Sequence, residues 1–230
     1  MLVSKLKKIT REIKHYGFSS LMLIKITEQI YNKKLKKIGI VYPNDTNNVE
    51  FINPLSSNKD SRCNQSTAYY QIKKAFNFTG INYSDICLLD IGCGFGKALN
   101  FGMLLNFKSV TGIDLDDVAI ERAIVNCKQM QQTGCISPFI VQHADACDYE
   151  IPGPVNLIFM ANPFGKKTMA HVLENIVTHC STQKKELYLV YTVPAHKELF
   201  AGYAACTKLY ESFTADKAGS EMAIFKIGYL

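Results

Sequence analysis

The sequence predicts an α/β fold: a doubly wound, mostly parallel, seven-stranded sheet with an antiparallel hairpin at one edge and a helical extension at the N-terminus. From about residue 68, short β-type apolar runs alternate with helical patterns, which is typical of a parallel sheet covered by helices on both faces. The last two runs are separated by only eight residues. Because this is too short for a crossover helix, we expect those two runs to pair as a hairpin.

The first forty residues predict two helices. In the first sixteen residues, apolar side chains recur at steps of four and three while basic side chains fill the other face, as the positions Leu2, Leu6, Ile9, Ile13 and Tyr16 illustrate. A second helical pattern covers residues 19–37, and residues 39–67 are rich in Asn, Ser, Pro and Asp, as in a linker. We therefore divide the chain into an extension, residues 1–66, and a domain, residues 67–230.

The domain begins with a helix that we expect Ser66 or Thr67 to cap. Further helices are expected to begin near Lys97, Val118, Thr168 and Ala195. The predicted strands are 86–91, 109–115, 139–144, 155–161, 186–193, 206–213 and 222–227. With 230 residues, 47% of them hydrophobic, the chain is long enough to bury one substantial core.

Charge is distributed unevenly along the chain. Residues 1–40 hold ten basic and two acidic residues, a net charge of +8, whereas the remaining 190 residues hold sixteen basic and eighteen acidic ones, a net charge of −2. Such a basic segment either packs on the domain with its charges in solvent or contacts an anionic membrane surface or a polyanion. A nucleic-acid substrate is permitted because basic residues neutralise phosphates, but no aromatic-rich basic groove accompanies the segment.

Cysteine and histidine spacing excludes several classes of protein. The eight cysteines are scattered without a CxxC pair, which indicates reduced, buried thiols in a cytoplasmic protein. The five histidines are dispersed and no spacing suggests zinc, so we expect no metal. The apolar run at 21–26 contains a lysine and is far shorter than the roughly 20 residues of a membrane span. We expect a cytoplasmic protein, peripheral to the membrane if the extension binds an anionic surface.

The stretch "LLDIGCGFGKAL", residues 88–99, carries the strongest functional signal. An apolar strand ends in Asp90 and is followed by Gly92, Gly94 and Gly96, which form GxGxG. A dinucleotide fingerprint would need GxGxxG, and here Lys97 stands where the third glycine should be. A carboxylate beside the loop is also an awkward neighbour for a pyrophosphate and a suitable one for a cation. The cationic nucleoside S-adenosylmethionine fits this loop better than NAD.

On these residues the chain resembles the class I, Rossmann-like, S-adenosylmethionine-dependent methyltransferases, over most of residues 86–227. In that family the loop embraces the cofactor, an acid after the second strand binds the ribose, and an acid after the third strand binds the adenine amino group. "VTGIDLDD" and "VQHADACDYE" supply these acids. The resemblance implies a cofactor site formed by Asp90, Gly92, Cys93, Gly94, Gly96, Asp114, Leu115, Asp145 and Ala146.

The segments after the fourth and fifth strands, "NPFG" and "YTVPAHKELF", supply candidate catalytic residues. "NPFG" is similar to a group of small bacterial methyltransferases of mostly unassigned substrate, which are distantly similar to the non-SET histone-lysine methyltransferases. That resemblance implies that Asn162 points at the reacting end of the cofactor. His196 is the histidine best placed to act as a base toward an oxygen nucleophile. The alternatives are an Asn-Pro turn before a helix and a polar residue at a helix start.

The same group also closes a Ser/Thr and a Tyr over the cofactor, in a position that matches "STAYY". The resemblance therefore implies cofactor contacts for Thr67 and Tyr70, with Tyr69 as an equal candidate. The predicted function is methyl transfer to a nitrogen or oxygen nucleophile, with lipid, polysaccharide precursor, protein and nucleic acid all open as acceptors. The alternatives are a degenerate cofactor-binding regulatory module and a nicotinamide-dependent oxidoreductase.

Overall fold

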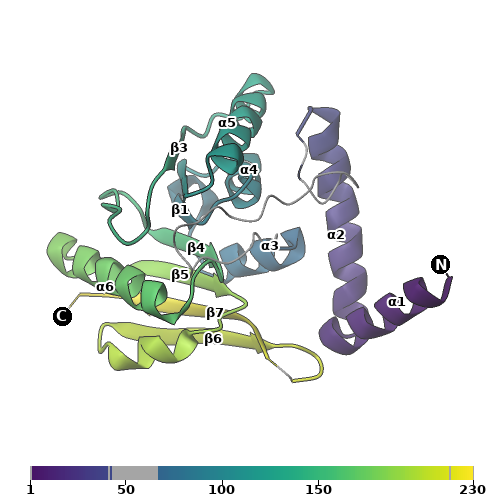
Figure 1. Cartoon of the computed structure of the whole chain (residues 1–230). Coiled ribbons are helices and arrows are strands. Elements are labelled where there is room, and N and C mark those ends of the chain that lie inside the picture. Colours follow the sequence, from purple (N-terminus) through teal and green to yellow (C-terminus); the bar gives the residue numbers. More distant parts are fainter. Residues whose placement is uncertain (1, 41, 43–66, 218, 230) are drawn as a thin grey trace.

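A computed structural model describes residues 2–40, 42, 67–217 and 219–229 of the chain (Figure 1). Its centre is a seven-stranded sheet in the order β3-β2-β1-β4-β5-β7-β6. The first five strands run parallel, and β7 pairs antiparallel with both β5 and β6. The strands are β1 (Cys87–Ile91), β2 (Ser109–Asp114), β3 (Phe139–His143), β4 (Leu157–Ala161), β5 (Leu187–Thr192), β6 (Cys206–Phe213) and β7 (Ser220–Ile227). The predicted fold class and edge hairpin are confirmed.

Helices cover both faces of this sheet and enclose two separate cores. The domain helices are α3 (Tyr69–Phe78), α4 (Lys97–Leu104), α5 (Asp117–Gln132) and α6 (Lys166–Gln183). Residues from α3, α4 and α5 share one core, whereas α6 packs in the core on the opposite face. Neighbouring residues of β1 point to opposite faces, since Leu88 lies in the first core and Leu89 in the second. Burial on both faces explains why the parallel strands are continuous apolar runs.

One of the expected helices is wrong. The segment after β5 forms only a 3-10 helix, Lys197–Gly202, in place of a helix from Ala195. Its chain turns sharply at Val193, with φ 47°, before it returns to the sheet at β6. Helix α6 begins at Lys166, near the expected Thr168.

Thr67 does not cap α3. The cap position belongs to Ala68, which makes no side-chain capping bond, and Ser66 lies outside the described residues. The Oγ1 atom of Thr67 lies 3.1 Å from Oγ1 of Thr192 at the end of β5. Thr67 therefore connects the start of α3 to the carboxyl end of the sheet.

The extension contains α1 (Leu2–Tyr16) and α2 (Phe18–Lys37), and both predicted helices are confirmed. Figure 1 shows α2 lying beside the domain near α3, with α1 turned away from it. Buried Leu21 and Leu35 lie on the inward face of α2, and Tyr31 packs its ring against Tyr69 and Phe101. The division between extension and domain stays a prediction, because the linker lies mostly outside the described residues.

Glu28 of α2 supplies the capping group that α3 lacks locally. Its Oε1 atom accepts a 2.6 Å hydrogen bond from the backbone N–H of Tyr69, the first residue of α3. The same carboxylate forms a salt bridge with the mostly buried Lys97, at 3.0 Å, and the Lys97 ammonium lies 4.2 Å from the ring centroid of Tyr69. One acid thus joins α2, α3 and the first residue of α4.

We expect Glu28→Ala to lower the free energy of unfolding by about 1–3 kcal/mol, because it removes the carboxylate that accepts from the backbone N–H of Tyr69 and pairs with the mostly buried ammonium of Lys97. Urea denaturation measures the change. The matched control is Glu186→Ala, which removes a 2.7 Å ion pair with Lys226 at the surface and should cost less than about 0.5 kcal/mol. Equal effects of the two substitutions would contradict the capping role.

Candidate functional site

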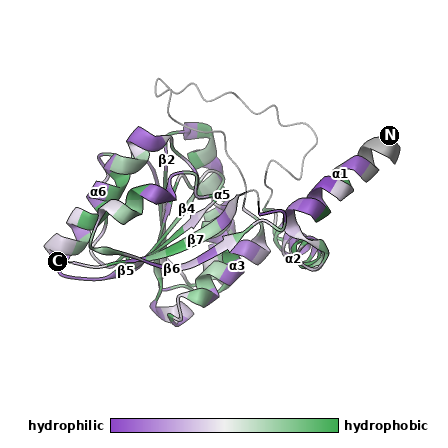
Figure 2. Cartoon of the chain, turned by 90° about the horizontal axis from the view of Figure 1, so that it is seen from below, coloured by the Kyte–Doolittle hydropathy of each residue, from purple (hydrophilic) through white to green (hydrophobic). Residues whose placement is uncertain are grey.

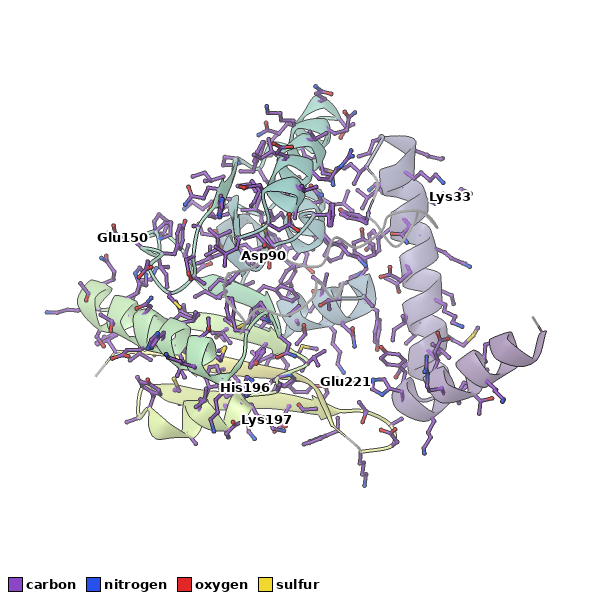
Figure 3. All side chains as sticks on the ribbon, viewed as in Figure 1. Lys33, Asp90, Glu150, His196, Lys197 and Glu221 are labelled. Atoms are coloured by element: carbon purple, nitrogen blue, oxygen red, sulfur yellow. The ribbon has the colours of Figure 1, made fainter. Side chains whose placement is uncertain are left out.

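The candidate site lies at the carboxyl ends of β1, β2, β4 and β5. The strand order reverses between β1 and β4, because the chain runs outward from β1 to β3 and then returns to β1's other side with β4. In open α/β sheets, ligands bind outside the strand ends at such a reversal. Asp90 and His196, both labelled in Figure 3, come from this end of the fold.

Backbone hydrogen bonds tie the glycine loop to the end of β2. The N–H groups of Gly92 and Cys93 both donate to the carbonyl oxygen of Ile113, at 2.9 and 3.0 Å. The N–H of Gly94 donates to Oδ2 of Asp114 at 2.8 Å. Gly92, Gly94 and Gly96 have φ values of 76°, 51° and 78°, in the left-handed region that side chains rarely adopt. The loop therefore has the conformation for which its three glycines are needed.

The loop also meets the segment that follows β4. A Cβ atom added to Gly92 would lie 2.9 Å from Cβ of Pro163, closer than real Cβ contacts. The predicted rim residue Asn162 stands immediately before this proline. The structure thus brings the glycine loop and the "NPFG" segment into van der Waals contact.

Asp90 and Asp114 are the two acids of this loop, and the pKa of each is raised. Burial raises the pKa of Asp90 well above its usual range, and the nearby Asp114 raises it further. Burial also raises the pKa of Asp114, although hydrogen bonds from the backbone N–H groups of Gly94 and Asp116 oppose that shift. Two desolvated carboxylates side by side favour a ligand that brings positive charge or hydrogen-bond donors.

The other two residues predicted at this site, Cys93 and Leu115, differ in how far their side chains are buried. Cys93 is buried, its Sγ lies against Gly112, and burial raises its thiol pKa well above the usual range. Its side chain therefore belongs to the core, and only its backbone belongs to the loop. Leu115 is exposed directly after Asp114. The structure places this apolar side chain at the rim.

The loop after β3 lies against the end of β2. The N–H of Ala144 donates to the carbonyl oxygen of Asp114 at 3.1 Å, so the following residues stand beside the predicted ribose-binding acid. Asp145 accepts a 2.9 Å bond from the N–H of Cys147, and Ala146 is buried in the core that contains α6. The structure brings Asp145 and Ala146 to the same end of the sheet as the glycine loop.

Asn162 is buried and strained, with φ 48°. It does not cap α6, because the cap position belongs to Gly165. Its Oδ1 atom lies 3.3 Å from the hydroxyl of Tyr191, which donates from β5. A non-glycine residue held in left-handed geometry is uncommon and concentrates at functional sites. Asparagine also adopts this region in turns, so the conformation fits a turn residue as well, while the hydrogen bond from Tyr191 fixes where the side-chain amide lies.

His196 is mostly buried at the start of the 3-10 helix after β5. Its Nδ1 atom lies 3.9 Å from Oε1 of Glu198, and its buried Nε2 atom has no hydrogen-bond partner among the described residues. Glu198 also lies 3.6 Å from the ammonium of Lys166. In the described part of the chain, no hydrogen bond joins His196 to Asn162 or to the two acids.

Of the two tyrosines before β1, Tyr69 is a core residue. It is fully buried, and its ring packs on Tyr31 and Phe101. Tyr70 is half-buried, which leaves it as the tyrosine available to a ligand. The sequence analysis did not single out Tyr191 and Thr192. Both lie at the carboxyl end of β5, the end of the sheet where ligands bind in open α/β folds.

No family model and no curated protein matches the chain. Solved structures do match its fold. An O-methyltransferase from Bacillus cereus, in complex with SAH, has a TM-score of 0.54 at 13% identity, covering 71% of this chain and 82% of its own. A tRNA methyltransferase from Bacillus subtilis has a TM-score of 0.53 at 14% identity, covering 72% of this chain and 68% of its own.

A magnesium protoporphyrin IX methyltransferase from Synechocystis, with bound SAH, has a TM-score of 0.51 at 10% identity, covering 73% of this chain and 90% of its own. Structural neighbours of this chain are therefore S-adenosylmethionine-dependent methyltransferases of the class I fold. At these identities the likeness shows the fold that the chain shares with them.

We expect Gly92→Ala to lower the free energy of unfolding by about 1–2 kcal/mol, because it places a side chain in the left-handed region and against Pro163. Thermal or urea denaturation measures the loss. Gly202→Ala is the control, since a Cβ there meets nothing within 4 Å. A neutral Gly92→Ala would mean that the two loops are not in contact.

Proposed function

We propose that the protein is an S-adenosylmethionine-dependent methyltransferase that transfers a methyl group to a nitrogen or oxygen atom of its substrate. The observation that carries this proposal is the pair of desolvated carboxylates, Asp90 and Asp114, on either side of the glycine loop. The loop stands at the strand reversal of a fold shared with S-adenosylmethionine-dependent methyltransferases. A cationic ligand rich in hydroxyl groups matches this site.

Each acid has a separate role in the proposal. Asp90 attracts the positive charge of the ligand, and Asp114 accepts hydrogen bonds from the ribose hydroxyls. Asp114 already accepts backbone N–H groups, those of Gly94 and Asp116 among them, but a carboxylate has about four acceptor sites and so keeps capacity for a hydroxyl donor. Asp145 and the backbone of Ala146 hold the adenine at the neighbouring strand end. Thr67 and Tyr70, from the segment before β1, cover the cofactor.

When bound, S-adenosylmethionine supplies an electrophilic methyl group. Asn162 orients the acceptor atom toward that group. Because its Oδ1 atom accepts from Tyr191, the amide is held in one orientation, and its backbone is fixed by the contact of Pro163 with Gly92. Alignment of the reacting atoms supplies much of the rate enhancement in such a transfer. For an amine acceptor, alignment of the nitrogen with the methyl group is the main requirement, and no separate base is needed.

An oxygen acceptor also needs a base, and His196 is the candidate. Its buried Nε2 atom is free to accept a proton, and Glu198 stands beside the other ring nitrogen. The nicotinamide alternative is disfavoured by Lys97. The ammonium of Lys97 is engaged by Glu28 and the ring of Tyr69, so it is not available to neutralise a pyrophosphate.

We expect Asp90→Asn to weaken S-adenosylmethionine binding by roughly 10- to 100-fold, the equivalent of about 1.5–3 kcal/mol for a lost charged interaction. The raised pKa of Asp90 means that the free protein holds a proton there at pH values where an ordinary carboxyl is ionised. A cationic ligand favours the ionised form. Affinity should therefore rise with pH through the raised pKa, and binding should release a proton below it.

The same substitution should stabilise the free protein at neutral pH. Stability from a carboxyl with a raised folded-state pKa is present below the unfolded value and is lost as pH rises through the folded one. Calorimetry in two buffers measures affinity and proton release, and melting curves measure stability. Asp148→Asn, at an exposed acid, is the control. Tight binding of NAD without a response to S-adenosylmethionine would refute the proposal.

A second prediction separates the roles of the rim residues. Asn162→Gly keeps the left-handed backbone without strain, so cofactor affinity should stay nearly unchanged while methyl transfer falls by about 100-fold. Transfer of a labelled methyl group into fractionated cell extract measures activity. If the acceptor is an oxygen, His196→Gln should lower transfer and should abolish the fall of the native rate toward acidic pH, because a base acts only in its unprotonated form. Cofactor binding without any transfer by the native protein would favour a regulatory module.

A further inference from the structure

The outward face of α2 is apolar, and no described residue of the chain covers it. Its side chains keep about half of their surface in solvent: Phe18 66%, Met22 46%, Leu23 46%, Ile26 47% and Ile30 58% exposed. With about 100° of rotation per residue, positions four apart lie on one face of a helix. Figure 2 shows α1 and α2 together on one side of the domain. We call these five residues the apolar ridge.

The apolar ridge is not needed to hold α2 on the domain. The inward face of α2 already carries buried Leu21 and Leu35, the Glu28 salt bridge and the ring contacts of Tyr31. These residues lie on the opposite side of the helix from the ridge. Large apolar side chains clustered at a surface mark an interaction site in most soluble proteins.

Basic residues surround the apolar ridge. Lys33 and Lys37 are exposed and continue the ridge face beyond Ile30, and Figure 3 shows Lys33 pointing away from the domain. Lys25, also exposed, lies beside the ridge and pairs with Glu12 of α1 at 3.1 Å. Helix α1 adds exposed Lys7, Arg11 and Lys14. Lys25, Lys33 and Lys37 thus flank the apolar face, within a segment whose net charge over residues 1–40 is +8.

Three kinds of partner could cover this face, and the charge and polarity of the face show which of them fits best. A second copy of the chain would bring a second segment of net charge +8 against the first, and the two would repel each other. A polyanion such as RNA would satisfy the lysines but leave five apolar side chains in water. The interface of an anionic bilayer satisfies both, because its headgroups attract cations while its acyl boundary takes apolar side chains.

We propose that the apolar ridge and its surrounding lysines dock the protein on the surface of an anionic lipid bilayer. Helix α2 lies in the plane of the interface with the ridge inserted. In the described part of the chain, no helix is long and apolar enough to cross a membrane. The inward face of α2 keeps its contacts with the domain.

Flotation of the full chain with vesicles tests this proposal. We expect binding to phosphatidylcholine vesicles that contain about 30% phosphatidylserine, and much weaker binding to pure phosphatidylcholine. Raising salt to about 0.5 M should weaken the binding, because the Debye length then falls to roughly 4 Å. The variant Phe18→Ser/Ile26→Ser/Ile30→Ser should bind at least about tenfold more weakly with an unchanged melting temperature. Lys33→Gln/Lys37→Gln should reduce the preference for anionic vesicles.

The matched control is Val125→Ser/Ile136→Ser/Ile140→Ser, which removes three comparably exposed apolar side chains from α5, β3 and the turn between them. It should bind vesicles like the native chain. Because the chain contains no tryptophan, Phe18→Trp adds a single reporter whose emission should shift to the blue on anionic vesicles. That reading does not depend on how the triple variants fold.

Four results would overturn the proposal. They are no flotation at low salt, equal flotation of the ridge variant and the native chain, no blue shift of the tryptophan, and RNA binding in the absence of any vesicle binding. A concentration-dependent dimer that the ridge variant abolishes, without vesicle binding, would assign the ridge to a second copy of the chain instead.

Discussion

Burial of two carboxylates at the ends of neighbouring parallel strands is the constraint around which the site is arranged. Asp90 lies one residue before the end of β1 and Asp114 is the last residue of the neighbouring β2, and burial raises the pKa of both. The N–H of Gly94 can donate to Asp114 only if the loop after β1 turns back over β2. That turn requires left-handed backbone, which the three glycines provide. The order of the strands, the conformation of the glycine loop and the proposed preference for a cationic ligand thus all depend on these two carboxylates.

Glu28 links the extension to the segments next to the glycine loop. Glu28 caps α3 and pairs with Lys97, the residue that follows Gly96. Helix α2 therefore has two faces with different partners: an inward face that organises the segments next to the glycine loop, and an outward face that is apolar and flanked by cations. Helix α2 therefore links two sites: the surface that its outward face contacts and the loop that we propose holds the cofactor.

Local patterns in the sequence were enough to predict the sheet, its edge hairpin and the strand-end acids, because strand and helix periods and glycine spacing are short-range properties. The misses depend on contacts between distant residues. The cap of α3 comes from Glu28, forty-one residues before Tyr69. The hydrogen bond of Asn162 comes from Tyr191 on the next strand.

The contact between Gly92 and Pro163 has a consequence for how such a protein diverges over time. The two residues lie on loops seventy-one positions apart, yet there is no room at position 92 for even one methyl group while the proline ring stays where it is. A lineage that acquires a side chain at position 92 must first lose bulk at position 163. Change in the segment that we propose orients the methyl acceptor is therefore tied to change in the glycine loop, whereas substitutions beyond the proline can alter that segment without disturbing the glycine loop.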